Sequence, residues 1–198
     1  MAPKRRTFQR ISGTRRYRKV FVIATEGAKT EQQYFSLFNN DKTSIQIKCL
    51  SNKKHKSSPK QVLSQMKKHL KDSELRKEDQ AWLVVDKDDW DDADLNLLYQ
   101  WSQQKEQYGL ALSNPMFEYW LTLHFDDGND ISTSRDCKAR IKQHIQEYDK
   151  NLNLRIFTPE NIQAAIQRAK VKDRPPCQDW PRQTGTTVYR LITSILAS

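Results

Sequence analysis

The chain has 198 residues, of which 36% are hydrophobic and 29% charged, and its formal net charge at neutral pH is +10. This length suffices for one domain with a buried core but is short for two full-sized domains. The composition excludes a membrane span, a secretion signal and a cysteine framework: no apolar stretch is long enough, and the three cysteines are far apart without a C-x-x-C motif. We expect a folded cytoplasmic domain.

The first 19 residues form a basic segment without a single acidic side chain. Its eight basic residues are Lys4, Arg5, Arg6, Arg10, Arg15, Arg16, Arg18 and Lys19. The rest of the chain has 26 basic and 24 acidic residues, so it is nearly neutral. Such an arm favours the phosphate backbone of nucleic acid, because each neutralised phosphate releases counterions. We expect a flexible, nucleic-acid-binding arm over residues 1–19; a merely solubilising or anionic-surface-seeking tail is the alternative.

The first predicted strand, Val20 to Thr25, is β-branched and apolar, and it ends at Glu26-Gly27. Thr30 and Gln33 have the spacing of a capping box, which predicts a short helix behind them. A second strand is expected at about residues 45–50.

A polar, basic loop follows over residues 51–58, and its lysines are further candidates for phosphate contacts: Lys53, Lys54 and Lys56. Ser58-Pro59 then provides an N-cap and a proline at the first helical position. We expect a helix behind this pair, with Val62, Leu63 and Met66 on its apolar side.

The clearest predicted strand, Ala81 to Val85, runs directly into a cluster of acidic residues: Asp86, Asp88, Asp89, Asp91, Asp92 and Asp94. From Leu95 the pattern is helical, with Gly109 as the expected C-cap. A short strand is expected at residues 110–113, and Asn114-Pro115 is expected to start another helix.

Strands that alternate with helices predict a mainly parallel sheet flanked by helices, that is, an α/β fold. The last third instead predicts helices near residues 135–148, 159–170 and 185–197. We expect a core domain over residues 20–130 and a helical extension over residues 131–198 that packs on it.

Carboxylates follow two of the predicted parallel strands, where open α/β sheets bind their ligands. Glu26 follows the first strand, and Asp86 and Asp88 follow the third with Lys87 facing the other way. Carboxylate oxygens suit Mg²⁺ or Mn²⁺. The alternatives are a surface carboxylate for Glu26 and a solvated helix N-terminus for the acidic cluster, an interpretation that we adopt for Asp91, Asp92 and Asp94.

These motifs resemble known families. Glu26-Gly27 and Asp86-Lys87-Asp88 are similar to the E-G and D-x-D signatures of the Toprim fold. Three longer segments resemble the RloB-like family: TEGAKTEQQYF at 25–35, VVDKDDW at 84–90 and SNPMFEYWLTLHF at 113–125. The likeness spans roughly residues 20–126, with a weaker echo at 186–192. It implies a Toprim-like α/β fold.

The resemblance also implies a phosphoryl-transfer site. Asp86 and Asp88 would hold Mg²⁺, with Glu26 as a further ligand or general acid/base. At other motif positions it implies second-tier site residues: Lys29, Glu31, Asn114 and Glu118. The family's genomic association implies a role in bacterial defence against phages. A nuclease activity follows by analogy from the fold.

Structural roles compete with several of these assignments. Asn114 and Glu118 could serve the fold alone, and Trp180 in its proline-rich loop is either a base-stacking platform or an anchor to the core. His55, His69 and His144 stand in charged stretches and form no ligand set.

The leading functional hypothesis is a Mg²⁺-dependent nuclease that acts on DNA or RNA. The alternative is a non-catalytic nucleic-acid-binding or adaptor subunit of a defence complex. A nucleotide hydrolase is less attractive because no Walker-type glycine loop is present. So short a chain has room for neither a sensor nor an ATPase module, which suggests a partner protein encoded nearby. Homodimerisation is left open.

Overall fold

The computed structural model describes residues 18–27, 29–39, 44–51, 58–87, 90–145, 148 and 152–198. Several predicted residues therefore lie outside the described part: Lys4, Arg5, Arg6, Arg10, Arg15, Arg16, Lys53, Lys54, His55, Lys56, Asp88 and Asp89. None of the described helices is long and apolar enough to cross a membrane.

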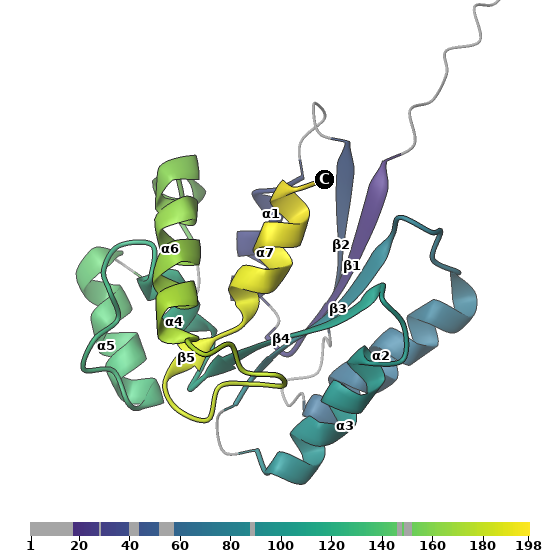
Figure 1. Cartoon of the computed structure of the whole chain (residues 1–198). Coiled ribbons are helices and arrows are strands. Elements are labelled where there is room, and N and C mark those ends of the chain that lie inside the picture. The colour runs from purple at the N-terminus through teal and green to yellow at the C-terminus, as the bar shows by residue number, and fades with distance from the viewer. Residues whose placement is uncertain are drawn as a thin grey trace, which may run out of the picture.

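A five-stranded sheet with the order β2-β1-β3-β4-β5 forms the centre of the described structure (Figure 1). Its strands are β1 (Lys19–Thr25), β2 (Ile45–Ser51), β3 (Gln80–Asp86), β4 (Tyr108–Asn114) and β5 (Gly185–Thr186). The first four strands run parallel, and β5 pairs antiparallel with β4. The predicted α/β fold with a mainly parallel sheet is confirmed.

Helices cover both faces of the sheet, as Figure 1 shows. On one face lie α2 (Pro59–Asp72) and α3 (Asp92–Ser102). The other face carries α1 (Thr30–Ser36), α4 (Phe117–Thr122), α5 (Ser134–His144), α6 (Pro159–Lys172) and α7 (Val188–Leu196). A single 3₁₀ turn, Leu154–Ile156, precedes α6.

Alternate residues of the central strands serve the two hydrophobic layers. In β1, Phe21 and Ile23 pack into the larger layer, whereas Val22 and Ala24 pack into the layer under α2 and α3. A strand that is buried on both faces needs an unbroken apolar run, because successive side chains point to opposite sides. This requirement explains why β1 and β3 were the clearest strands in the sequence.

The helix α2 begins as predicted. The side-chain oxygen of Ser58 accepts a hydrogen bond from the N–H of Gln61, and the Gln61 side chain accepts one from the N–H of Ser58. The corresponding prediction for Thr30 and Gln33 was wrong. Thr30 already lies inside α1, and the side-chain oxygen of Gln33 accepts a hydrogen bond from the distant Leu152 N–H at 2.9 Å.

The prediction that Gly109 caps a helix was also wrong, because α3 ends at Ser102 and Gly109 lies in β4. Gly109 pairs with Trp82 of β3, and a Cβ atom at position 109 would approach the Trp82 ring to 2.5 Å at Cδ2. The glycine is therefore required for the indole to pack across the sheet. It does not end a helix.

Asn114 does not start a helix, contrary to the prediction. It is the last residue of β4 and pairs with Gly185, and α4 begins three residues later at Phe117. Its side-chain amide donates a hydrogen bond to the Pro181 carbonyl at 3.1 Å. Asn114 thus ties the loop before β5 to the edge of the sheet.

The C-terminal extension is helical as predicted, but it also supplies β5, which the sequence did not predict. In this pairing Ser113 faces Thr186, and their hydroxyl oxygens are 2.9 Å apart. The last helix accordingly begins at Val188 rather than at 185. The larger hydrophobic layer continues across residue 130, the expected boundary between the core domain and the extension, from Trp120 to Ile192; that boundary stays a prediction.

Candidate functional site

The carboxyl ends of β1 and β3 bring Glu26 and Asp86 together, as the parallel topology predicts. One carboxylate oxygen of Glu26, Oε2, lies 3.4 Å from the Asp86 N–H that donates to it. The other, Oε1, accepts a hydrogen bond at 3.2 Å from the indole N–H of Trp90. Glu26 is therefore fixed at the end of the neighbouring strand, and Trp90 is a site residue that no sequence motif had singled out.

The Asp86 carboxylate connects β3 to α4. Its Oδ1 accepts a hydrogen bond at 2.8 Å from the backbone N–H of Phe117, the first residue of α4. Burial raises the pKa of Asp86 well above its usual value, and the negative charges of Glu31, Glu118 and Glu26 raise it further, against the opposing effect of the Phe117 hydrogen bond. Asp86 thus lies within the electrostatic reach of three other carboxylates.

The third carboxylate, Glu31, is buried in α1 with 6% of its surface exposed. Its Oε1 accepts a hydrogen bond from the Gly27 N–H at 3.0 Å. A Cβ atom at position 27 would lie 2.5 Å from the Glu31 carboxyl carbon. The glycine of the E-G motif therefore makes room for this carboxylate in the turn that follows β1.

Glu118 is the fourth carboxylate and lies in the first turn of α4 with 8% of its surface exposed. Its Oε1 accepts a hydrogen bond from the Tyr148 hydroxyl at 2.8 Å. The pKa of Tyr148 is raised by burial and by the charge of Glu118, so this hydroxyl keeps its proton and donates it. Tyr148 is 30 residues away from Glu118 in sequence, and no local pattern pointed to it.

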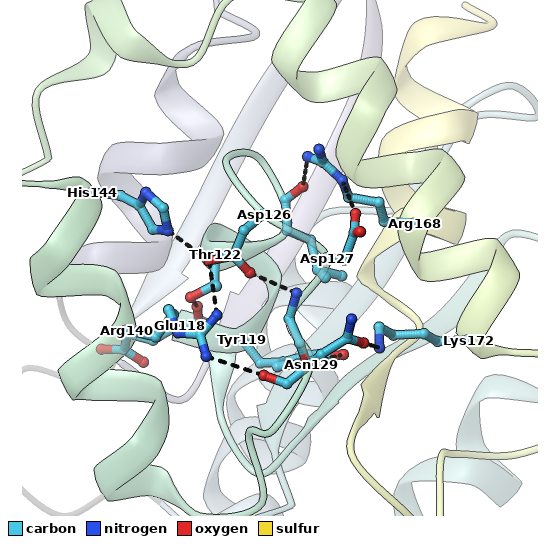
Figure 2. Close-up of polar contacts among 12 residues, drawn as sticks. Glu118, Tyr119, Thr122, Asp126, Asp127, Asn129, Arg140, His144, Arg168 and Lys172 are labelled. Atoms are coloured by element: carbon cyan, nitrogen blue, oxygen red, sulfur yellow. Dashed lines mark hydrogen bonds and ion pairs between the residues drawn. The ribbon is translucent and has the colours of Figure 1, made fainter.

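The far end of α4 is held by α5 and α6 (Figure 2). Asp126 accepts hydrogen bonds from Arg140 at 3.3 Å and from His144 at 2.6 Å, both of which belong to α5. From α6, Arg168 donates to the Leu123 carbonyl and to Asp127, each at 2.8 Å. Because α4 is anchored in this way, the first turn that carries Glu118 and the Phe117 N–H has a fixed position.

Lys29 and Asn114, two further predicted site residues, are placed differently from the carboxylates. Lys29 is exposed at the residue before α1, where its carbonyl accepts the Gln33 N–H at 2.9 Å. Asn114 holds the Pro181 loop, as described above. The structure therefore brings together Glu26, Glu31, Asp86 and Glu118.

The other features of the acidic cluster serve the fold. Asp91 is the N-cap of α3 and accepts a hydrogen bond from the Asp94 N–H at 2.7 Å, which confirms the helix-terminus interpretation. Lys87 donates to the Trp90 carbonyl and pairs with Asp92 at 3.4 Å. Among the competing structural assignments, Trp180 is buried with 2% exposure in the layer beneath α3, so it anchors its loop.

The four carboxylates have the donor chemistry of a hard divalent cation. Crowded like charges raise the pKa of Asp86, and a cation between the carboxylates would relieve that repulsion. Within the described residues, no group of three or more His, Cys, Asp or Glu side chains is arranged to hold a metal ion by itself. Asp86 and Glu26 could supply the one or two carboxylates that Mg²⁺ takes in most proteins. Asp88, the third expected ligand, lies outside the described residues.

The fold and this site define an α/β protein with an acidic centre at the carboxyl edge of its parallel strands. The family model described as "RloB-like protein" matches residues 21–195. The chain therefore belongs to the RloB-like family, and the match includes all four carboxylates and extends into α7. Comparisons with curated proteins and with solved structures gave no significant match.

Proposed function

We propose that this protein is a Mg²⁺-dependent nuclease that hydrolyses phosphodiester bonds in nucleic acid. The observation that supports the proposal is the convergence of Glu26 and Asp86 at the ends of adjacent parallel strands, with Glu31 and Glu118 close enough to raise the pKa of Asp86. A structural surface cluster does not need carboxylates that are buried and held by backbone N–H groups, because burying charge costs free energy.

The chemistry of phosphodiester cleavage explains why such a site needs a cation. An anionic phosphate is repelled by four carboxylates unless positive charge stands between them. Mg²⁺ held by Asp86 and Glu26, with Asp88 as the proposed third ligand, would neutralise charge on the phosphate and lower the pKa of a bound water. Negative charge on this set of side chains is thus required for substrate binding in the presence of the ion.

The side chains themselves would orient and move protons. Glu26 is held by Trp90 and by the Asp86 N–H, which leaves its carboxylate fixed at the edge where it could accept a proton from an attacking water. Glu31 and Glu118 would position the site, because they fix the Gly27 turn and Tyr148. Lys29, exposed beside this edge, would bind a phosphate oxygen.

The test is cleavage of plasmid DNA and total tRNA by the purified protein with Mg²⁺, with Mn²⁺ or with EDTA. We expect metal-dependent cleavage that is lost in Asp86→Ala and in Glu26→Gln. Glu74→Gln is the matched control, because Glu74 is an exposed carboxylate that follows α2. The control should cleave like the unchanged protein.

Two results would count against this proposal. Cleavage that survives in Asp86→Ala would place the reaction elsewhere. Binding of nucleic acid without cleavage under any metal would favour a non-catalytic binding or adaptor subunit. The biological setting that we propose, defence of bacteria against phages with a partner encoded nearby, rests on the family alone.

A further inference from the structure

The solvent-exposed face of α2 carries a row of lysines that the predicted nucleic-acid contacts did not include. Lys60, Ser64, Lys67 and Lys71 follow each other at intervals of four, three and four residues, so they share one side of the helix. They are all exposed, as is Lys68 beside them. We call Lys60, Lys67, Lys68 and Lys71 the lysine stripe.

The opposite face of α2 fixes this orientation. Val62, Leu63 and Met66 are buried against the sheet in the smaller hydrophobic layer, so the helix cannot rotate its lysines away from solvent. The lysine stripe borders an open depression of about 450 Å³, which Leu63 and Ser64 also line. The surface is therefore a fixed, shallow and cationic groove.

Most of the positive charge in the stripe is not neutralised. Lys60 pairs with Asp94 of α3 at 2.6 Å. Within the part of the chain that the structure describes, no ion pair engages Lys67, Lys68 or Lys71. Three adjacent ammonium groups without acidic partners repel one another, and a multivalent anion would relieve that repulsion.

The stripe leads away from the candidate site. β2 is parallel to β1, so its last residue, Ser51, stands at the same edge as Thr25 and the following Glu26. α2 follows β2 in the chain and returns along the face of the sheet beside α3 (Figure 1). The eleven residues from Lys60 to Lys71 extend over roughly 17 Å of helix, a distance that corresponds to about ten phosphate charges of duplex DNA.

The chemistry of this face favours a polyphosphate backbone over other anionic partners. The described large apolar residues that are exposed, Leu97, Val171 and Leu196, all lie outside α2. A membrane-binding helix would add apolar or aromatic residues beside its lysines, and the centre of a protein interface is depleted in lysine. A row of compact cations on a rigid helix suits repeating phosphates.

We propose that the lysine stripe binds the phosphate backbone of the nucleic acid at a distance from the carboxylate site, and so determines the path of the substrate over α2. This inference rests on the proposed function for the identity of the substrate. It differs from it in requiring binding alone, and the two can therefore fail separately.

The test compares Lys67→Gln/Lys68→Gln/Lys71→Gln with a control of equal charge change, Lys77→Gln/Lys138→Gln/Lys142→Gln, in the full chain. Binding of a labelled DNA duplex is measured in EDTA between about 50 and 200 mM salt, where each lost phosphate contact lowers the slope of log K against log salt by about 0.9. We expect the stripe variant to lose up to about 2.7 in slope. The control should keep its slope.

The possible results separate the two proposals. Equal slopes for the stripe and control variants, or no binding of duplex or single strand by the unchanged protein, would overturn the role of the stripe. A reduced slope in a protein that never cleaves would support the stripe and remove the nuclease. Stronger loss of binding to anionic vesicles than to DNA would transfer the stripe to a membrane surface and overturn the inference. Equal thermal unfolding midpoints of the two variants show that both are folded.

Discussion

At the scale of single residues, Gly27 determines where the Glu31 carboxylate can lie. Gly27→Ala would place a Cβ atom about where the carboxyl group stands, 2.5 Å from its carbon, and Glu31 would lose its hydrogen bond to the residue 27 N–H. We expect at least tenfold lower nuclease activity and a loss of about 1 to 3 kcal/mol in the free energy of unfolding, as overpacking and a broken buried hydrogen bond each cost.

A second background identifies the cause. In Glu31→Ala protein the obstructing carboxylate is gone, so the further change Gly27→Ala should cost little stability. The measurement is a double-mutant cycle by urea unfolding. Equal costs of Gly27→Ala in both backgrounds would mean that the turn itself requires glycine.

The partners of the site residues were harder to predict than the residues. Glu26 and Asp86 were predicted because they directly follow apolar strands, and strand ends in a parallel sheet meet at one edge. Trp90 and Tyr148 hold Glu26 and Glu118 through contacts that span 64 and 30 residues. Such pairs arise only when helices pack, and no local spacing encodes them.

At the scale of elements, His124 joins the end of α4 to α1. Its Nδ1 lies 3.0 Å from the Trp120 carbonyl and 3.1 Å from the Leu121 carbonyl, so Nδ1 carries the proton. The other nitrogen, Nε2, must then accept the hydrogen bond from the Tyr34 hydroxyl at 3.1 Å. Protonation of Nε2 would break this link between two buried helices.

This link predicts a stability that depends on pH. Burial lowers the pKa of His124 to about 4, an effect that the two carbonyl hydrogen bonds oppose and the charge of Arg168 assists. In the unfolded chain the pKa is about 6.5. The unfolded state therefore binds the proton more tightly, and folded-state stability is fully present above about pH 6.5 and lost as the pH falls towards 4, by about 3 kcal/mol in total.

The double variant Tyr34→Phe/His124→Phe removes the titrating group without leaving either polar partner of the pair unsatisfied. Urea unfolding at about pH 7 and pH 4.5 should show a smaller stability loss in the variant than in the unchanged protein. If both proteins lose the same stability, acidic groups rather than His124 control this pH range.

Elements were predicted well where local sequence decides them and poorly where a neighbour does. The ends of β1 and the start of α2 follow from an apolar run and a capping box. Gly109 was misread because the reason for the glycine, the Trp82 ring, stands on another strand. The two-residue β5 exists only as a partner of β4, more than 70 residues earlier, and its sequence alone has no strand pattern.

At the scale of the whole molecule, positive charge is concentrated in the N-terminal arm and in the lysine stripe, whereas negative charge collects at the candidate site. The alternation of strands and helices was enough to predict the sheet and the edge at which the site lies. It was not enough to predict which helix would complete the site. Glu118 belongs to that site because α5 and α6 hold α4 against the end of β3, and this arrangement depends on the packing of the whole chain.

The arm should act separately from the stripe if both bind phosphates. Deletion of residues 1–17 removes six basic side chains and keeps Lys19, the first residue of β1. On duplex DNA we expect the slope of log K against log salt to fall by up to about 5, because each lost contact lowers it by about 0.9. Combination with the Lys67, Lys68 and Lys71 changes should lower the slope by the sum of the separate effects, since distant contacts release their counterions independently. A slope that the deletion leaves unchanged would exclude the arm from nucleic-acid binding, and the stripe and the residues around the site would then account for all of it.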